Sequence, residues 1–439
     1  MRNFGYNLKM RFDVPEPSVP EPRLIPRPEH QVSRKDVDVE ALKVLYRLHH
    51  AGYTAYLVGG SVRDLLLGKR PKDFDVVTDA RPGELRKLFR NSRIIGRRFR
   101  LVQVFFRGGH IVEVSTFRRR SEFEEVQEAT PTRDNTFGTP AEDAQRRDLT
   151  INGLFYNIAD FSLVDYVGGL EDLKARRIRV IGDPAGRYVR DPVRMLRVLR
   201  HAARTGFEIE SQTWKELLAK RDLIRTCVPA RVRDEVLKDF RSAAARPFFK
   251  LMLESRLFYA IFPAWKGLGG PGERRLLELA GRLDLLLQAG TSLSDSLLWA
   301  VFLTAFLEQE PGSQDSKELR QLFHERIKAA LGGIEFPRQR HDEVSQMLAL
   351  ESRVAPFLNK HQPPPARLTR LALYPEVWLL HQIKEAPETE LAEKTQLEAL
   401  PARVPQPAKE AQPGRRRPRR RRRGGRGRGR GEKKPGGGG

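Results

Sequence analysis

The feature that most limits the fold of this chain is a change in the spacing of its apolar residues at about Asp165. From Ser33 to about Ile158, stretches with alternating apolar residues are interleaved with stretches of helical spacing, which predicts strands and helices in one unit. From there to about residue 395 the spacing is mostly helical. With 439 residues, enough for two or three domains, the chain is expected to fold as an α/β head followed by a helical body.

The two ends of the chain differ from this folded part. Residues 1–32 are rich in proline and lack periodic apolar positions, so an extended segment is expected before a folded region that begins at Ser33. After a linker, the segment from Pro413 to the end holds eleven Arg, two Lys and one Glu, a charge of +12 and half of the +24 excess of the whole chain. Such a segment cannot bury a core, so we expect a disordered tail that binds phosphates through charge.

The overall charge points to a polyanionic partner. Nucleic acid fits better than a membrane surface, because no basic amphipathic stretch with lipid-facing aromatic residues stands out. The longest apolar run, Leu297 to Leu307, is far below the ~20 residues of a membrane-spanning helix and predicts a buried core helix. The first residues lack the apolar core of a signal peptide, which favours a cytoplasmic protein. The single cysteine, Cys227, excludes intrachain disulfides and cysteine-cluster zinc sites.

A small-residue turn between an expected strand and an expected helix is the first candidate binding site. Residues 54–58, TAYLV, read as a strand; Gly59, Gly60 and Ser61 follow, and VRDLLL predicts a short helix that Gly68 ends. Glycines let a backbone approach a phosphate closely, and the amides at a helix start point toward the anion. Taken alone this pattern is common and needs support from neighbouring residues.

Asp73 and Asp75, in the stretch PKDFDVV, supply that support. At a spacing of two residues in a strand both carboxylates point to one face, while the apolar residues between and after them can pack into the core. Two carboxylates near a triphosphate suit Mg²⁺, and a pair of such ions activates an attacking hydroxyl and stabilises leaving pyrophosphate. The same spacing at residues 36–38 lacks the turn and the apolar strand, and it predicts a helix start instead.

A third acidic ligand is expected, and two residues are candidates. Glu113 lies in HIVEVST, an expected strand that forms a hairpin with LVQVFF. Asp148 lies in AQRRDLTINGLFY, where the spacing of the apolar residues suggests a helix face. The alternatives are a solvated strand glutamate and an aspartate paired with Arg146 or Arg147. Residues 118–140, between the two candidates, are charged and without periodicity, which indicates a mobile loop.

A polar stripe is expected on a helix further along the chain. In RDPVRMLRVLRHAARTGF, residues Asp191, Arg194, Arg197 and His201 recur every three or four positions. Beside a nucleotide site such a stripe can read a base edge, because Asp accepts and Arg donates hydrogen bonds. The alternative is an intrahelical salt bridge.

These motifs together resemble a known family. The series LVGGSVRDLLLG, PKDFDVVT, RRDLTINGLFY, DYVGGLEDL and RDPVRMLRVLRHAARTGF, in this order, strongly resembles bacterial poly(A) polymerases and CCA-adding tRNA nucleotidyltransferases, from about His30 to Pro263. The segment RDNTFGTPAEDAQRRDLTIN, the stretch before LVGG and the basic tail look like the poly(A) polymerase branch. The alternatives are a CCA-adding enzyme and a non-catalytic RNA-binding relative.

The resemblance implies an α+β fold with a polymerase β-like nucleotidyltransferase head, built on a small mixed sheet, and helical neck and body domains. The implied divisions are a head at 33–165, a neck at 166–245 that binds the nucleotide base and RNA, an RNA-binding body at 246–398, and a linker and disordered tail at 399–439. The implied activity is template-independent addition of AMP to RNA 3′ ends. The implied partners are ATP, the 3′ ends of mRNA and structured small RNAs, and RNA-decay machinery, with no membrane.

The resemblance also implies roles for single residues. Asp73 and Asp75 match the pair that binds Mg²⁺, or Mn²⁺ in its place, and Asp148 matches a third catalytic carboxylate, with Glu113 as a rival metal ligand. The residues implied in nucleotide binding are Gly59, Gly60, Ser61 and Arg63 at the triphosphate and Asp191, Arg194 and Arg197 at the base. The chain departs from the family at Arg190, where a Glu is usual, and this departure puts nucleotide selectivity in doubt.

Overall fold

The computed structural model describes residues 21–96, 100–119, 137–308, 316–388 and residue 391, which lie within one compact unit, Met1–Leu397. The predicted linker and tail at 399–439 lie outside the described residues, as does most of the loop expected at 118–140. No helix in the described part of the chain is long and apolar enough to span a bilayer.

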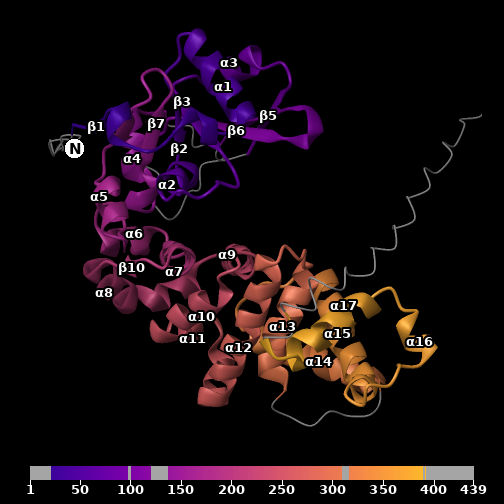
Figure 1. Cartoon of the computed structure of the whole chain (residues 1–439). Helices are drawn as coiled ribbons and strands as arrows, with labels where there is room; N and C mark the ends of the chain where they lie inside the picture. Colours follow the sequence, from indigo (N-terminus) through magenta and orange to yellow (C-terminus); the bar gives the residue numbers. More distant parts are fainter. Residues whose placement is uncertain (1–20, 97–99, 120–136, 309–315, 389–390, 392–439) are drawn as a thin grey trace, which may run out of the picture. The chain divides into compact units, whose positions relative to one another are not determined.

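One eight-stranded mixed sheet forms the head and confirms the fold predicted for it (Figure 1). Its spatial order is β1-β8-β7-β2-β3-β6-β5-β4, and β3 and β6 are the neighbours that pair in parallel. The strands are β1 (Arg23–Ile25), β2 (Ala55–Val58), β3 (Asp75–Thr78), β4 (Ser92–Ile95), β5 (Leu101–Phe105), β6 (Ile111–Thr116), β7 (Leu154–Asn157) and β8 (Leu163–Asp165).

Strand β1 shows that folding begins earlier than Ser33, so that expectation is wrong. It pairs antiparallel with β8, and Ile25 at its end is buried with Val32 in the main core. The prolines around it obscure the strand in the sequence, because only three residues join the sheet, at an edge that tolerates proline nearby.

Strand β7 replaces the helix expected after Asp148. It lies between β2 and β8, and its residues are buried on both faces: Leu154 and Tyr156 in the main core, Phe155 in a smaller one. A short apolar run that is buried on both sides has no alternation to distinguish a strand from a helix. The helical interpretation of LFYNI was therefore wrong.

Helices cover the sheet on both faces. The buried side of α1 (Val39–His50) packs with β2 and β3, and the Asp38 carboxylate caps it by accepting a hydrogen bond from the Ala41 amide at 3.0 Å, as predicted for residues 36–38. Helix α4 (Pro140–Arg146) packs on the other face through Ala144, beside Val58 and Val77. The remaining helices of the head are α2 (Gly60–Leu66) and α3 (Pro82–Leu88).

The neck is mostly but not entirely helical, in contrast to the all-helical neck that the resemblance implied. Strands β9 (Arg177–Ile178) and β10 (Glu208–Ile209) form a short parallel pair within it. A buried ion pair, in which Arg200 Nε donates to Asp239 Oδ1 at 2.7 Å, joins α7 to α9. The helices are α5 (Gly169–Lys174), α6 (Pro184–Arg190), α7 (Arg194–Thr205), α8 (Ser211–Lys220) and α9 (Pro229–Phe240).

The body is a bundle of helices around α13. Helix α13 (Asp295–Leu307) is buried along nearly its whole length, which confirms the core helix predicted from the longest apolar run. Phe302 of α13 contacts a set of aromatic rings, among them Phe249 and Trp265. The other helices are α10 (Ala245–Glu254), α11 (Leu257–Ile261), α12 (Gly269–Gln288), α14 (Ser316–Leu331), α15 (Arg338–Leu358), α16 (Ala366–Thr369) and α17 (Tyr374–Glu385).

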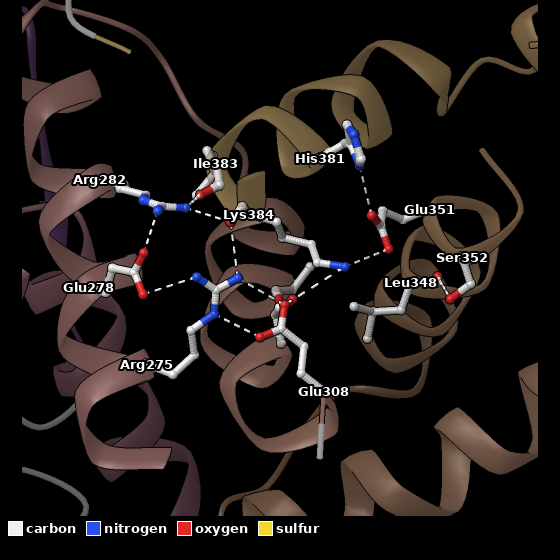
Figure 2. Close-up of polar contacts among 12 residues, drawn as sticks. Arg275, Glu278, Arg282, Glu308, Leu348, Glu351, Ser352, His381, Ile383 and Lys384 are labelled. Carbon is white, nitrogen blue, oxygen red and sulfur yellow. Dashed lines mark hydrogen bonds and ion pairs between the residues drawn. The ribbon is translucent and has the colours of Figure 1, made fainter. Parts of the chain in front are cut away.

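A network of charged side chains joins α12, α15 and α17 to the end of α13 (Figure 2). Arg275 of α12 forms a two-bond contact with Glu308, through Nε at 2.7 Å and Nη2 at 3.0 Å. Lys384 of α17 donates to Glu351 of α15 at 2.9 Å, and the other Glu351 oxygen lies 3.1 Å from Nδ1 of His381. These contacts connect helices that are far apart in the sequence.

Candidate active site

A row of residues across the centre of the sheet brings two carboxylates side by side. The parallel register of β3 and β6 places Asp75 next to Glu113, and the antiparallel register of β6 and β5 places Glu113 next to Gln103. The Gln103 amide donates to Glu113 Oε1 at 3.0 Å. Lateral neighbours in a sheet share a face. Glu113 is therefore held beside Asp75 by two strand pairings and a hydrogen bond.

Asp73 is placed differently from the expectation. Strand β3 begins at Asp75, so Asp73 lies in the segment before it and is exposed, and the strand pleat does not set its direction. The prediction that both aspartates lie in one strand is wrong, although their assignment as metal ligands stays a prediction. The ligand oxygens of Asp73, Asp75 and Glu113 are not among the described groups in which all candidate ligand atoms lie within 4.8 Å of one another.

The electrostatics around Asp75 favour a cation. The residue is exposed, yet surrounding protein removes part of its hydration, and this desolvation together with the nearby Glu113 raises the pKa of Asp75. Arg147 opposes the shift, and Asp73 adds to it. A raised carboxyl pKa means that the protein disfavours the negative charge there. A divalent cation would offset both the lost hydration of Asp75 and its repulsion by Glu113. Carboxylate oxygens are the ligands that Mg²⁺ takes.

The glycine turn lies at the N-terminus of α2, beside an arginine. Gly59 has a φ of 75° and a ψ of −134°, a conformation that glycine adopts without strain. A Cβ atom on Gly59 would lie 3.4 Å from Nη1 of Arg147, so this guanidinium lies directly over the turn. Ser61 is buried, and its hydroxyl donates to the Val58 carbonyl at 3.0 Å, which ties the turn to β2.

Arg63 lies beneath this turn and is buried, with 4% of its surface exposed. Its guanidinium donates to Asn152 Oδ1 at 2.7 Å and to Asp64 Oδ1 at 2.7 and 2.9 Å. Nη1 also lies 3.3 Å from Nδ1 of His201 in α7. Burial lowers the pKa of His201 well below its ordinary value and Arg63 lowers it further, so the ring is neutral. Arg63 thus connects the turn to the neck.

Asp148 lies at the junction of head and neck, paired with arginines of α7. Its carboxylate forms a very short contact with Nη1 of Arg194 and lies 2.8 Å from Nη1 of Arg197. The alternative pairing with Arg146 or Arg147 is wrong, since both of these arginines bind Asp143 of α4 instead.

Asp191 extends this charged group. It caps the end of α6 and precedes α7, so the stripe that begins with it does not lie on a single helix. Its carboxylate lies 3.7 Å from Nε of Arg194 and accepts a hydrogen bond from Nη2 of Arg231 in α9 at 2.8 Å. The expected salt bridge between Asp191 and Arg194 is present but long, and the short partner of Arg194 is Asp148. Arg194 is thereby held between two carboxylates.

The predicted residues therefore fall into two groups. Asp75, Glu113 and the Gly59 turn gather at the central strands, whereas Asp148 lies with the neck residues Asp191, Arg194 and Arg197. Sequence reasoning missed Arg147 as a member of the first group. Its Nε and Nη2 both donate to Asp143 Oδ2, and its guanidinium lies 5.3 Å from the Phe155 ring centroid. The signal in the sequence was its position one turn after Asp143 on a short helix.

Two of the motifs that carry the family resemblance, DYVGG and TING, have a structural explanation. A Cβ atom on Gly169 would lie 2.2 Å from the Thr150 carbonyl oxygen, and one on Gly153 would lie 2.5 Å from Val167. The Asp165 carboxylate accepts hydrogen bonds from three backbone amides, those of Val167, Gly169 and Leu170. DYVGG and TING thus pack against each other, which holds the segment after Asp148 in place.

Comparisons with known proteins identify what this chain is similar to. Residues 55–179 match the family described as "Poly A polymerase head domain", and residues 206–268 match "Probable RNA and SrmB- binding site of polymerase A". The chain is 41% identical over 348 residues to Poly(A) polymerase I of Escherichia coli, covering 76% of this chain and 73% of that protein. It is 50% identical over 252 residues to Poly(A) polymerase I of Salmonella typhi, covering 56% of this chain and 54% of that one.

CCA-adding enzymes are related as well. The Lactobacillus helveticus CCA-adding enzyme is 33% identical over 285 residues, which are 65% of this chain and 67% of that one. The solved Bacillus stearothermophilus CCA-adding enzyme in complex with CTP superposes with a TM-score of 0.61 at 25% identity, covering 82% of this chain and 81% of that one. The identity and coverage shared with the E. coli enzyme, together with the matching head and RNA-binding regions, show that this chain belongs to the poly(A) polymerase family.

Proposed function

We propose that this protein is a template-independent poly(A) polymerase, which transfers AMP from ATP to RNA 3′ ends in the cytoplasm and releases pyrophosphate. The observation that carries the proposal is the position of Asp75 beside Glu113, next to the Gly59 turn, in a chain that aligns with poly(A) polymerases over 76% of its length. Like charges side by side in a sheet are destabilising unless something balances them, so this pair favours a cation-dependent enzyme over a non-catalytic relative.

Asp75, Glu113 and Asp73 are the residues that would hold Mg²⁺, with Mn²⁺ as a substitute. The fit rests on their oxygen donors and on the raised pKa of Asp75, which is caused first by desolvation of its carboxylate and then by the negative charge of Glu113. When bound, the metal supplies stabilisation of the negative charge that develops during nucleotidyl transfer. Asp148 forms ion pairs with Arg194 and Arg197. To act as the third catalytic carboxylate, it would have to contact the metal while keeping these ion pairs.

Arg147 and the Gly59 turn would receive the triphosphate. Arg147 is held by Asp143 and lies over Gly59, so its positive charge is already positioned where the phosphates would approach the turn. Arg63 is buried beneath and would support the turn through Asn152 and His201 rather than contact the phosphates. Preorganised charge of this kind supplies much of the rate in phosphoryl transfer.

The nucleotide test is incorporation from ATP, CTP, GTP and UTP, each supplied alone, on an unstructured RNA primer with Mg²⁺. We expect long products from ATP and little extension from the other three. The rival function is CCA addition, because the chain is also similar to CCA-adding enzymes. Addition of only a few nucleotides, from CTP as well as ATP and only to tRNA, would identify that activity instead.

Arg194 would help to select the base. Its guanidinium is fixed between Asp148 and Asp191, and a fixed donor beside an acceptor can recognise the edge of adenine. In Arg194→Ala, we expect the preference for ATP over CTP, measured as the ratio of kcat/KM values, to fall about tenfold. The mutant keeps Asp148 paired through Arg197, so its fold should survive.

The matched control is Arg204→Ala, which removes an exposed arginine from the same helix. It should leave the ratio unchanged. An Arg194→Ala enzyme with normal preference for ATP would remove Arg194 from base selection.

RNA would bind to the neck and body, where residues 206–268 match an RNA-binding region of polymerase A. The basic tail would add affinity that does not depend on base sequence, because contacts to phosphates carry no sequence information. The RNAs concerned would be mRNA and structured small RNAs, and RNA-decay machinery would be the protein partner.

A further inference from the structure

A second cluster of metal-ligating side chains lies in the body. His324 of α14 and the consecutive residues His341 and Asp342 of α15 each offer a ligand atom, and these atoms all lie within 4.8 Å of one another. Among the described residues no other group of three or more His, Cys, Asp or Glu side chains meets this condition. None of these three residues belongs to the candidate active site.

His341 has a buried nitrogen that is not satisfied by hydrogen bonding. The residue lies in the first turn of α15 and is 8% exposed. The Ser345 hydroxyl donates its proton to the His341 carbonyl at 2.8 Å, so its oxygen is left to accept from Nδ1–H, 3.4 Å away. In the tautomer that carries its proton on Nδ1, the lone pair lies on Nε2, and Nε2 is buried without a hydrogen-bond partner among the described residues. Buried polar atoms in proteins nearly always have a partner, so an unpaired nitrogen here indicates a bound ligand.

The surroundings of His341 place a second imidazole and an apolar shell beside its ring. The His324 and His341 ring centroids are 3.9 Å apart, and one nitrogen of each ring lies within 4.8 Å of the other. Phe336 packs at the edge of His341 and also contacts Trp299 of α13, which places apolar rings behind the site. A second partner on the other ring nitrogen and an apolar shell are typical of metal-bound histidines.

We propose that His324, His341 and Asp342 form a binding site for Zn²⁺, which joins α14 to α15. Two imidazole nitrogens and one carboxylate oxygen are a donor set that suits zinc, with a water molecule as the fourth ligand. Zinc–ligand bonds of ~2.0–2.2 Å in a tetrahedral site place the donor atoms about 3.5 Å apart, and the three donors here, all within 4.8 Å of one another, can reach this spacing through small side-chain movements. His324 is exposed and can rotate, whereas Ile327, one turn later, is buried and holds α14 in place.

An ordinary core histidine would explain these observations less well. Such a residue satisfies both ring nitrogens, and contact between two histidine rings, tilted by 53° here, does not by itself explain why a carboxylate oxygen of Asp342 lies within 4.8 Å of both. The proposal does not depend on the polymerase activity, because it concerns neither the nucleotide nor the RNA.

The test uses the full chain, purified without a histidine tag and stripped with a chelator. Zn²⁺ binding is measured by calorimetry in millimolar Mg²⁺, which occupies oxygen-ligand sites and competes poorly for imidazole. We expect one Zn²⁺ per chain and a higher melting temperature with Zn²⁺. His324→Ala should weaken the affinity by more than about 100-fold and abolish the thermal shift, while the Zn²⁺-free melting temperature stays unchanged, because an exposed ligand is lost.

Two further variants sharpen the test. Ser345→Ala removes the acceptor for Nδ1–H of His341 and should weaken Zn²⁺ by about tenfold without loss of the 1:1 stoichiometry. His110→Ala removes an exposed histidine from the head and should bind Zn²⁺ as the wild type does. Equal Zn²⁺ affinity in the wild type and His324→Ala, or no Zn²⁺ binding by the wild type, would overturn the proposal.

Discussion

Asp75→Asn is expected to reduce AMP incorporation by more than about 10³-fold while leaving the protein as stable as the wild type. The amide keeps the shape of the side chain but removes the charge that would hold Mg²⁺ beside Glu113. Stability should not fall, because the pKa of Asp75 is raised in the folded protein. The folded state therefore disfavours the ionised carboxylate at neutral pH, and removal of its charge relieves repulsion.

The measurements are primer extension with ATP, primer binding in the absence of turnover, and thermal unfolding. Asp79→Asn is the matched control, since Asp79 is an exposed aspartate directly after the same strand. It should retain full activity. An active Asp75→Asn enzyme would refute the catalytic assignment, and a lost primer affinity would show that Asp75 acts through RNA binding instead.

Glu351→Gln is expected to destabilise the body by about 3 kcal/mol at pH 7, because removal of one partner leaves buried charge uncompensated. Glu351 is 4% exposed and is bound by Lys384 and His381, as Figure 2 shows. Burial opposes its ionisation, but His381 and Lys384 outweigh burial and lower the pKa of Glu351 in the folded state. Within the described part of the chain, Lys384 would keep only Glu308, 3.8 Å away, as a charged partner.

The effect of Glu351→Gln should depend on pH with a defined sign. A lowered folded-state pKa contributes stability above the unfolded value of 4.5, and this contribution is lost as the pH falls through the lower folded value. The stability difference between wild type and mutant should therefore be full at pH 7 and shrink below about pH 4.5.

Urea unfolding followed by tryptophan fluorescence measures this difference, since Trp265 and Trp299 are buried in the body. Glu385→Gln is the control at an exposed site in α17 and should change the free energy of unfolding by less than ~0.5 kcal/mol. A Glu351→Gln midpoint equal to that of the wild type would mean that the network contributes nothing net to stability.

Parts of the head fold and of the candidate site could be predicted from local patterns. The turn at Gly59, the helix cap at Asp38 and the hairpin that contains Glu113 each depend on residues close together in the chain, and all three are present. The interpretation of residues 154–157 as helical failed because burial on both faces removes the alternation that marks a strand. The edge strand at Arg23–Ile25 was missed because its partner lies about 140 residues away in sequence.

Sequence patterns alone determined that this chain has an α/β head, a helical body and an acidic pair after a glycine turn, because periodicity and turn chemistry act over a few residues. The mixed sheet of the head was implied by the family resemblance. Only the tertiary structure decided which acid lies beside Asp75, since that depends on the parallel pairing of β3 with β6 across a sheet. It likewise decided that Asp148 meets Arg194 and that His324 meets His341. Such contacts join segments through packing, and packing leaves no periodic mark in the order of the residues.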